Sequence, residues 1–462
     1  MQGFIETNRE DPEKVDVSHR VFTFDEIYEF FNNRTVSRQS ERCVQCGDPF
    51  CTTMGCPLSN HIPQWLEAVA ERDLKKAFLL SNETSPFPEV LGRICPHNRL
   101  CEGACTLDDG YGAITIGPIE ASITDLAFEA GYRLPFPGIT SEKKVAVIGS
   151  GPAGMSCAHF LLRAGIQVDM FERSDLPGGL LTYGIPGFKL DKNIVRRRFG
   201  ILKSAGLNLH LNSEIGHDIP FSDLLRDHDA IFLGLGATNG KRAGIPGEDH
   251  PNVFLAMEFL TNMQRRLLGK SWMERFGVLG KRVVVIGGGD TAMDCVRTAV
   301  RDGAAKVTCL YRRDEENMPG SRKEYLNAVE EGVVFMFNEA PKGIVLDDDG
   351  SVGGVDAINT ELGEPGPDGR QRVSEVEGSG HCVPADVVIM ALGFDMEGLP
   401  FLQDAGVNLG KWGEISIDPA NGRTSHEKIF AGGDCMRGAD LAVTAAADGR
   451  RAAMAIMEDL LG

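Results

Sequence analysis

Residues 143–154 are Lys143-Lys-Val-Ala-Val-Ile148 followed directly by Gly149-Ser-Gly-Pro-Ala-Gly154. The first half is an apolar run typical of a buried parallel strand. The second half is a G-x-G-x-x-G pattern, which predicts a tight turn into a helix that begins near Ala153 and binds a pyrophosphate with its first amides. The next predicted strand, 167–171, ends at Glu172, where a carboxylate can accept hydrogen bonds from ribose hydroxyls. The stretch therefore predicts a Rossmann-like dinucleotide-binding domain.

A second strand and glycine cluster follow later in the chain. Lys281-Arg-Val-Val-Val-Ile286 continues into Gly287-Gly-Gly-Asp-Thr-Ala292, the G-x-G-x-x-A form of the same fingerprint, with a helix predicted over 291–301. The strand predicted over 306–311 ends in Arg312-Arg313. Because guanidinium groups pair with phosphate and a carboxylate repels it, this ending favours NADPH over NADH. The alternative is a pair of solvated arginines at a strand end.

The C-terminal part indicates which site holds the flavin. Two dinucleotide sites in one chain are typical of enzymes that pass hydride between a nicotinamide and a flavin. The stretch Thr424-Ser-His-Glu-Lys-Ile-Phe-Ala-Gly-Gly-Asp434 resembles the T-x6-A-x-G-D signature of two-domain flavoprotein reductases, whose aspartate reaches the ribityl and phosphate region of FAD. The segment 230–237 resembles the strand and turn that close such an FAD domain, and 441–449 predicts a helix start facing the flavin. FAD is therefore expected at the first fingerprint.

These patterns give a set of expected cofactor contacts. For FAD they are Gly149, Gly151, Pro152, Ala153, Gly154, Glu172, Arg173, Gly179, Leu180, Gly236, Gly433, Asp434 and Thr444. For NADPH they are Gly287, Gly289, Asp290, Thr291, Arg312 and Arg313.

Seven of the twelve cysteines lie in the first 105 residues, as Cys43-x2-Cys46-x4-Cys51-x4-Cys56-Pro57 and Cys95-x5-Cys101-x3-Cys105. Disulfides require an oxidising compartment, but residues 1–10 lack the basic and apolar regions of a secretory signal. Zinc fits Cys43-x2-Cys46 alone, because the other spacings do not supply a second x2 pair. A cysteine run ending in Cys-Pro is typical of iron–sulfur proteins, in which the last cysteine serves the other of two clusters. This pattern predicts that Cys43, Cys46 and Cys51 hold one cluster and that Cys56 joins ligands of the second group. Two [4Fe-4S] clusters need eight ligands, so either one ligand is not cysteine or one cluster is smaller.

Length and composition limit the other possibilities. The 462 residues suggest about three domains, and a formal net charge of −19 argues against nucleic-acid binding. Since the apolar runs are shorter than the ~20 residues that span a bilayer, a cytoplasmic protein without membrane contact is expected. The predicted fold class is α/β, with two Rossmann-like domains after a helical iron–sulfur domain. The expected ranges are 1–140 for the iron–sulfur domain, 141–245 and 392–462 for an interrupted FAD domain, and 246–391 for the NADPH domain.

Several longer motifs together resemble one family. The cysteine groups combine with 178–189 (Gly-Gly-Leu-Leu-Thr-Tyr-Gly-Ile-Pro-Gly-Phe-Lys), 287–295, 311–314 and 317–321. From about residue 20 to the C-terminus, this combination is similar to the small (β) subunit of bacterial NADPH-dependent glutamate synthase, a relative of the N-terminal region of dihydropyrimidine dehydrogenase. The resemblance implies that Cys43, Cys46, Cys51 and Cys105 hold one [4Fe-4S] cluster, and that Cys56, Cys95, Cys101 and Glu120 hold another.

One detail departs from the family pattern, because four residues rather than three separate Cys51 from Cys56. The loop before Cys56 is therefore one residue longer than the family pattern. In the flavoprotein half, Cys157, Cys295, Cys309, Cys382 and Cys435 are isolated in sequence, so no disulfide acceptor is predicted beside the flavin. Most of these five are expected to be buried core thiols.

The resemblance also implies a function. NADPH reduces FAD, and the clusters pass electrons to a large (α) subunit that makes L-glutamate from L-glutamine and 2-oxoglutarate, in a hetero-oligomer. Hydride transfer between bound cofactors needs no side-chain acid or base, and residues 183–189 are expected to line the flavin site. One alternative is an electron-input subunit for another partner, of pyrimidine reductase or NADPH–ferredoxin type. Another is a nucleotide-binding redox sensor without turnover.

Overall fold

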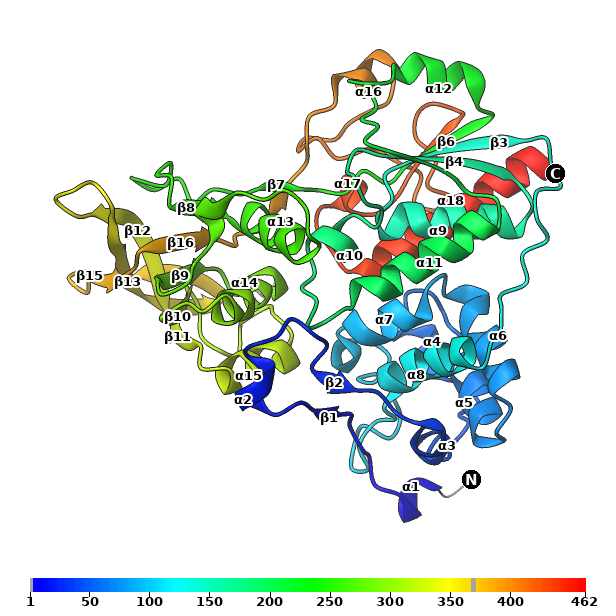
Figure 1. The fold of residues 1–462 in the computed structure, drawn as a ribbon, viewed down its shortest axis with the longest axis horizontal. Helices are drawn as coiled ribbons and strands as arrows, with labels where there is room; N and C mark the ends of the chain where they lie inside the picture. Colours follow the sequence, from blue (N-terminus) through cyan, green and yellow to red (C-terminus); the bar gives the residue numbers. More distant parts are fainter. Residues whose placement is uncertain (1–2, 367–370) are drawn as a thin grey trace.

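The computed structural model describes residues 3–366 and 371–462. Two parallel sheets flanked by helices lie beside a helical N-terminal region, shown in blue and cyan (Figure 1). This arrangement agrees with the predicted α/β fold class. None of the helices within the described ranges combines the length and apolarity that would span a membrane.

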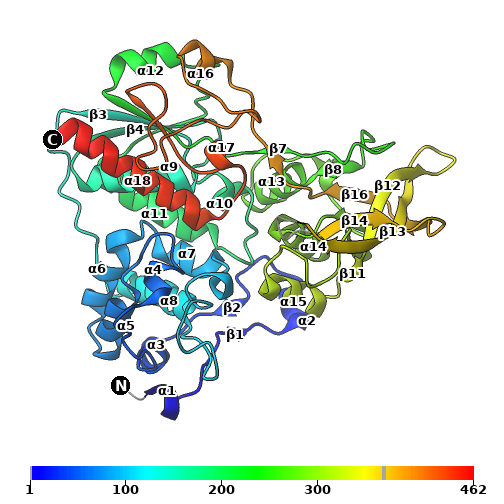
Figure 2. The same ribbon diagram turned by 180° about the vertical axis from the view of Figure 1, so that it is seen from behind.

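The first sheet has the strand order β18-β6-β3-β4-β5 and is parallel throughout. Its central strand β3 is buried along four of its five residues because it has neighbours on both sides and helices on both faces. Helices α9 and α18 pack together on one face with α11, as seen from behind in Figure 2, and α12 and α16 cover the other. The bounds are β3 Lys144–Ile148, α9 Pro152–Arg163, β4 Gln167–Glu172, α10 Leu180–Tyr183, α11 Lys192–Ser204, β5 Asn208–Leu211, α12 Phe221–Asp227, β6 Ala230–Leu233, α16 Pro400–Asp404, β18 Ile429–Ala431, α17 Asp434–Arg437 and α18 Ala442–Leu461.

The second sheet interrupts the first in sequence, with the parallel order β11-β10-β9-β16-β8. Helices α13, α14 and α15 cover one face, and a four-stranded antiparallel sheet of β12 to β15 covers the other. Where the chain enters and leaves this region, β7 and β17 pair antiparallel. The bounds are β7 Asn239–Gly240, β8 Val253–Leu255, α13 Ala256–Leu267, η2 Glu274–Phe276, β9 Arg282–Ile286, α14 Asp290–Arg301, β10 Lys306–Tyr311, α15 Arg322–Glu330, β11 Val334–Phe337, β12 Glu339–Leu346, β13 Val352–Pro365, β14 Gln371–Glu375, β15 His381–Pro384, β16 Val387–Met390 and β17 Phe394–Asp395.

The N-terminal region is built from helices around a core that contains Trp65, which is completely buried. The cysteines lie mostly in the connections between these helices. A short hairpin of β1 and β2 extends from the region toward α15, and the sequence did not predict it (Figure 1). The bounds are α1 Gly3–Glu6, β1 Glu13–Lys14, α2 Val17–Arg20, β2 Tyr28–Glu29, α3 Asn33–Ser40, α4 Phe50–Thr53, α5 Ile62–Ala70, α6 Leu74–Thr84, α7 Pro88–Ile94, η1 His97–Arg99 and α8 Ile116–Glu129.

Candidate cofactor sites

The glycines of the first fingerprint have three different roles. Gly149 has φ +92°, and a Cβ there would lie 2.3 Å from the Gly234 carbonyl oxygen. A Cβ at Gly154 would lie 1.9 Å from the Gly149 carbonyl oxygen, so this position allows α9 to pack tightly on the turn. At Gly151 a Cβ would meet no described atom within 4 Å. The first and third glycines therefore form the turn, and the second leaves room for a ligand at the start of α9.

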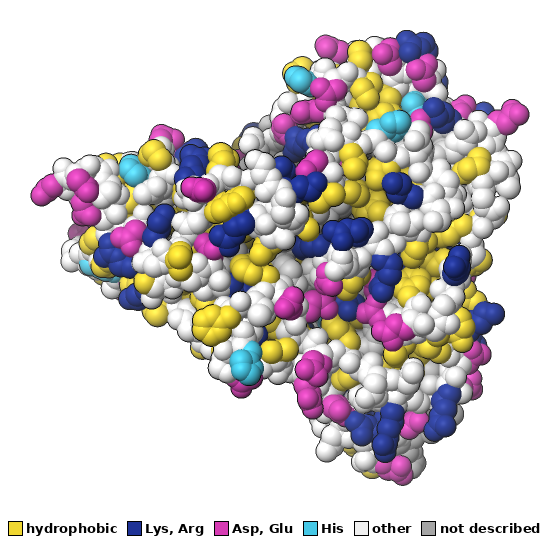
Figure 3. Space-filling model, in the orientation of Figure 1, with side chains coloured by type: hydrophobic (Ala, Val, Ile, Leu, Met, Phe, Trp, Pro, Cys, Tyr) yellow, Lys and Arg dark blue, Asp and Glu magenta, His cyan; other side chains and the backbone are white. Residues whose placement is uncertain are grey.

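A cavity of about 680 Å³ opens in front of this turn, between the two sheets. Its volume lies within the range of protein sites for small molecules and cofactors. Yellow apolar and dark blue basic side chains meet in the hollow between the upper and left lobes in Figure 3. Of the residues expected to contact FAD, those that line the cavity are Gly149, Gly151, Pro152, Ala153, Glu172, Arg173, Gly179, Leu180, Gly236, Gly433 and Asp434.

The other two expected FAD contacts lie outside this lining. Gly154 packs behind the turn, and the Thr444 hydroxyl donates a hydrogen bond to the Leu441 carbonyl oxygen at 2.7 Å. On the same helix start, Leu441, Ala442 and Ala445 line the cavity instead. The start of α18 therefore faces the cavity with apolar side chains.

Two carboxylates at the cavity are held differently. Glu172 is 6% exposed and accepts hydrogen bonds from the amides of Ser150 at 3.1 Å and Ser174 at 2.8 Å. It thus holds the first turn in place and lines the cavity beside it. Asp434 follows β18, and burial raises its pKa to about 6. Arg173 lies at the rim, where it donates hydrogen bonds to Glu397 at 2.9 Å and Thr238 at 3.0 Å.

The second fingerprint repeats the turn geometry. Gly287 has φ +144°, and a Cβ there would lie 2.3 Å from the Ala391 carbonyl oxygen. At Gly289 a Cβ would have no atom within 4 Å among the residues described. Asp290 and Thr291, which begin α14, line the central cavity, so this site opens toward the first. The Asp290 carboxylate accepts a hydrogen bond from the Ser321 amide at 2.8 Å.

The two arginines lie beyond β10, outside the lining of the central cavity. Arg312 is exposed. Arg313 is half-buried and donates one long hydrogen bond, at 3.4 Å, to the Gln371 carbonyl oxygen. Its buried Nε has no hydrogen-bond partner within the described part of the chain. The Arg313 guanidinium is therefore held only weakly by the described residues.

The sequence did not predict several residues that line the cavity. Glu258, Thr261 and Asn262 face it from α13, and their i, i+3, i+4 spacing was a detectable polar stripe. Asp294 also lines it and forms an ion pair at 2.8 Å with Lys189, a lining residue that belongs to the expected stretch 183–189. Burial raises the pKa of Asp294 to about 6, although Lys189 opposes this effect.

The cysteines gather around two smaller cavities. Cys43, Cys46, Cys51 and Cys105 line the first. Cys56, Cys95, Cys101 and Glu120 line the second. These are the two ligand sets that the family resemblance implied. No group of three or more His, Cys, Asp or Glu in the described residues is arranged to hold a single metal ion.

The second set fits a cluster by its chemistry. Burial raises the pKa of the Cys56 thiol to about 11 and that of the Glu120 carboxyl, on α8, to about 8. Such groups are neutral when the site is empty, and a cluster supplies the positive charge that stabilises them as anions. The Glu120 carboxylate accepts a hydrogen bond from Asn60 at 2.8 Å, which fixes its orientation.

The longer spacing before Cys56 is accommodated by a helical turn. Residues 50–53 form α4, and the Gly55 amide donates to the Phe50 carbonyl oxygen at 2.8 Å. A Cβ at Gly55 would lie 2.7 Å from the Cys101 Cα, so a glycine permits this close approach. Cys56 thus reaches the second cavity despite the extra residue.

The three cavities form a series. Cys95 lines both the central cavity and the second cysteine cavity. At the start of α18, Val443 lines the cysteine cavity while its neighbours face the central one. Ile116 lines both cysteine cavities. Shared or adjacent lining residues therefore connect each cavity to the next.

The remaining cysteines are not part of this series. Cys157, Cys295, Cys309 and Cys435 are buried, as expected for core thiols, and Cys382 is exposed.

Acidic and basic side chains are interspersed over the face shown in Figure 3.

Two glycine-rich turns of the dinucleotide-binding type face one cavity, and a cysteine-lined region lies behind it. This combination defines a pyridine-nucleotide oxidoreductase with an appended iron–sulfur region. Residues 143–449 match the family model of the pyridine nucleotide-disulphide oxidoreductases. Residues 20–132 match the model described as dihydropyrimidine dehydrogenase domain II, 4Fe-4S cluster.

Comparison with curated proteins narrows the family. The chain is 49% identical to the glutamate synthase [NADPH] small chain of Escherichia coli (strain K12), over 98% of each chain. It therefore belongs to the family of these small chains, as the motifs predicted. The putative oxidoreductase UacF of the same organism is also 49% identical, over 96% of this chain and 71% of the relative.

A solved structure supports the fold. Mycobacterium tuberculosis FprA in complex with NADPH aligns with a TM-score of 0.57 at 19% identity, covering 69% of this chain and 85% of that one. The predicted fold class and the expectation of an oxidoreductase are confirmed.

Proposed function

We propose that this protein oxidises NADPH and passes the electrons, through FAD and two [4Fe-4S] clusters, to a large (α) glutamate synthase subunit that forms L-glutamate from L-glutamine and 2-oxoglutarate. The observation that carries the proposal is the series of three cavities joined at Cys95 and Ile116. Such a series gives electrons a defined exit from the nucleotide site.

The cofactors would be held as follows. The first turn, with Glu172 and Asp434, binds FAD, and the start of α14, with Arg312 and Arg313, binds NADPH. Bound there, FAD would supply the conversion between two-electron hydride chemistry with NADPH and one-electron transfer to the clusters. The two cysteine sets ligate the clusters, with Glu120 as the non-cysteine ligand. The domain ranges 1–140, 141–245 with 392–462, and 246–391 correspond to these roles.

The protein's own contribution is binding and orientation. Leu180, Met257 and Leu260 line the central cavity and restrict water around the reacting rings. The amides at the start of α18 stabilise negative charge on the flavin edge. No side chain is assigned a proton transfer in the hydride step. We further propose that the protein acts in the cytoplasm as part of a hetero-oligomer with the large subunit.

Anaerobic stopped-flow absorbance tests the proposed electron transfer within this chain, from NADPH through FAD to the clusters. Mixing the holoprotein with NADPH should bleach the flavin band first and the broad iron–sulfur absorption afterwards. In a variant with Cys95→Ser, flavin bleaching should persist while reduction of the clusters slows. If NADPH leaves the wild-type flavin band unchanged, the proposal is wrong. The partner is tested by copurification, followed by a glutamine-dependent NADPH oxidation assay with 2-oxoglutarate.

A second candidate partner follows from the similarity to UacF. That relative carries nearly this whole chain within a longer protein named only as a putative oxidoreductase. The same electron-input module could therefore serve an acceptor other than glutamate synthase, such as a pyrimidine reductase or a ferredoxin. NADPH oxidation that depends on such an acceptor, and not on the large subunit, would favour this candidate.

A further inference from the structure

An N-terminal segment joins parts of the molecule that are distant in sequence. Residues 12–31, here called the strap, comprise β1, α2 and β2 and leave the helical region to lie along α15 (Figures 1 and 2). The strap belongs to none of the three cavities that carry the proposed electron path. Its contacts nevertheless reach helices that line the central cavity.

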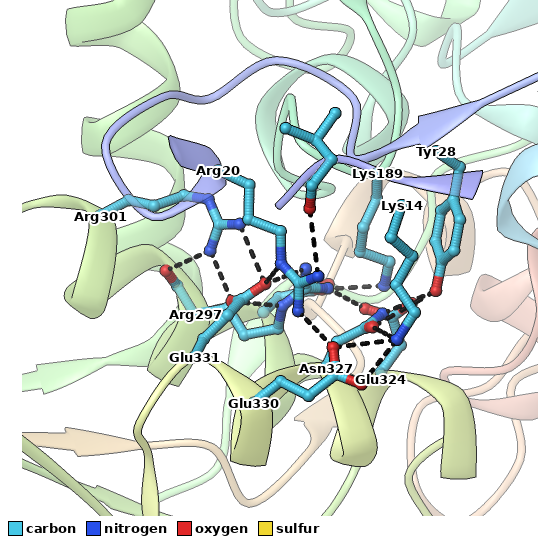
Figure 4. A network of polar contacts seen from close by, with 12 residues as sticks. Lys14, Arg20, Tyr28, Lys189, Arg297, Arg301, Glu324, Asn327, Glu330 and Glu331 are labelled. Carbon is cyan, nitrogen blue, oxygen red and sulfur yellow. Dashed lines mark hydrogen bonds and ion pairs between the residues drawn. The ribbon is translucent and has the colours of Figure 1, made fainter. Parts of the chain in front are cut away.

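Arg20 is the main contact between the strap and the second sheet region. It is 3% exposed and donates to Glu331 at 3.1 Å and to Glu330 at 2.6 Å. Around it, Lys14 donates to Glu330 at 2.7 Å, and the Tyr28 hydroxyl accepts a hydrogen bond from Asn327 at 2.9 Å. Figure 4 shows these groups converging on the carboxylates at the end of α15.

Glu331 does not depend on Arg20 for its charge balance. Its carboxylate also accepts hydrogen bonds from Arg297 at 2.9 and 2.8 Å and from Arg301 at 2.7 and 3.1 Å. Burial opposes ionisation of Glu331, but the hydrogen bonds from Arg301 and Arg297 outweigh it and lower the pKa to about 2. The second sheet region therefore completes this ion cluster by itself, and Arg20 attaches to a preformed carboxylate.

On its other side the strap holds the loop that borders the flavin position. The Ile27 amide donates to the Phe188 carbonyl oxygen at 3.2 Å. The guanidinium groups of Arg297 and Arg301 lie over the Phe188 ring, at 4.4 and 4.0 Å from its centre. The next residue, Lys189, makes the ion pair with Asp294 at the cavity wall. The strap and α14 thus both contact the loop that contains Phe188 and Lys189.

A second attachment ties the strap to the rest of the molecule. The Glu26 carboxylate accepts hydrogen bonds from the Asp191 amide at 2.9 Å, at the start of α11, and from Arg93 at 2.8 Å, on α7. One end of the strap is therefore fixed to the first sheet and to the helical region. The Arg20 end is fixed to the second sheet.

Apart from the strap, the two sheet regions are joined by the chain crossings at β7 and β17 and by a few direct ion pairs. These pairs are Asp175 with Arg265 at 3.3 Å, Asp175 with Lys270 at 3.1 Å, and Lys189 with Asp294 at 2.8 Å. Domains joined by two short links rotate relative to one another unless an interface holds them. Hydride transfer requires the two rings to be held at about 3–3.5 Å in a fixed orientation. We propose that the strap holds the second sheet region in the orientation that transfers hydride, and that Arg20 is a positioning residue for this step. This inference rests on the proposed function.

The test is Arg20→Met in the holoprotein, with Lys14→Met as the matched control on the same strap. Lys14 contacts a half-exposed carboxylate, so its pair is screened and contributes little. Losing the buried Arg20 pairs weakens the strap by more, and we expect the limiting rate of flavin reduction by NADPH to fall about tenfold or more. The dissociation constant for NADPH and the cluster signals after dithionite reduction should not change. Arg20→Lys should restore part of the rate.

Domain orientation gives a readout that does not depend on turnover. Spin labels on the exposed Cys382 and on a Glu427→Cys substitution would report the distance between the two sheet regions in the oxidised protein. Arg20→Met should broaden the distance distribution, and Lys14→Met should leave it narrow. An unchanged limiting rate, or a slower rate with a narrow distribution, would overturn the inference. If NADPH fails to reduce the wild-type flavin, the proposed function fails, while the spin-label distances still test the strap.

Discussion

The preference for NADPH over NADH is predicted to depend on Arg312 and Arg313, and Arg313→Ala is the sharper perturbation. The present contacts of Arg313 are weak, because its one hydrogen bond is 3.4 Å long and its Nε has no partner in residues 3–366 and 371–462. Removing the side chain should therefore cost the fold little. It should instead remove donors for the 2′-phosphate of NADPH.

The magnitude follows from the type of bond that is lost. A hydrogen bond to a charged group contributes about 1.5–3 kcal/mol net. Since 1.4 kcal/mol is a factor of ten, Arg313→Ala should weaken NADPH binding by about 10-fold to 100-fold. Two additive losses of at least about 10-fold would give about 100-fold for the double variant with Arg312→Ala, and coupling between the neighbouring side chains shifts this value in either direction. NADH, which has no 2′-phosphate, should bind as before.

The assay is the anaerobic rate of flavin bleaching as a function of nucleotide concentration. It separates the dissociation constant, which should rise for NADPH, from the limiting rate, which should stay constant. Arg322→Ala is the control, because Arg322 is an exposed arginine of the same region that already pairs with Glu315. The reasoning is refuted if the double variant keeps its preference for NADPH. It is also refuted if NADPH and NADH weaken equally, since the arginines would then support the fold and not the phosphate.

Three further predictions concern the clusters, the first turn and the ion cluster at Glu331. Glu120→Ala should lose the electron paramagnetic resonance signal of one cluster and about half of the iron, whereas Cys382→Ser should keep both; full iron content in Glu120→Ala would exclude ligation by this residue. Gly154→Ala places a Cβ 1.9 Å from the Gly149 carbonyl oxygen, so purified protein should lack FAD, and normal flavin content would contradict the packing role of this glycine. The pKa of Glu331 is lowered in the folded state from 4.5 to about 2, so its ionisation stabilises the fold above pH 4.5, and that stability is lost as the pH falls toward 2. At 1.36 kcal/mol per pKa unit this amounts to about 3 kcal/mol, and urea unfolding of Glu331→Gln should show a smaller loss over the same pH range than the wild type.

The sequence predicted the parts of the fold in which local sterics restrict the backbone to one conformation. Each fingerprint combines a buried strand with glycines, and at Gly149 and Gly287 a side chain would collide with a carbonyl oxygen. The chain must therefore turn at these positions. The two sets of candidate cluster ligands were harder to predict from the sequence, because the spacing alone left seven cysteines for eight ligand positions. The Cys-Pro ending separated Cys56 from the three cysteines before it, and the family resemblance supplied the rest of the division.

Other features depended on contacts that no local pattern records. The strap hairpin has two-residue strands, too short for alternation to reveal. Thr444 was expected among the FAD contacts, but it lies outside the cavity lining and its hydroxyl donates to the Leu441 carbonyl oxygen. Threonine near a helix start commonly bonds to its own backbone in this way. The cavity-lining role of α13 required knowing how the two sheets face each other.

The candidate cluster ligands of the two cysteine cavities lie close together in the sequence. The relative positions of the cavities are therefore difficult to change. Cys51 and Cys56 belong to different cavities yet are separated by four residues, which span at most about 18 Å when fully extended. Cys101 and Cys105 connect the same two cavities across an even shorter segment. Two independent short links therefore hold the two cysteine cavities together. Cys95, six residues before Cys101, holds the second cysteine cavity against the central cavity. A rearrangement that separated the proposed donor from its relay would have to unfold α7 or the turn that follows it.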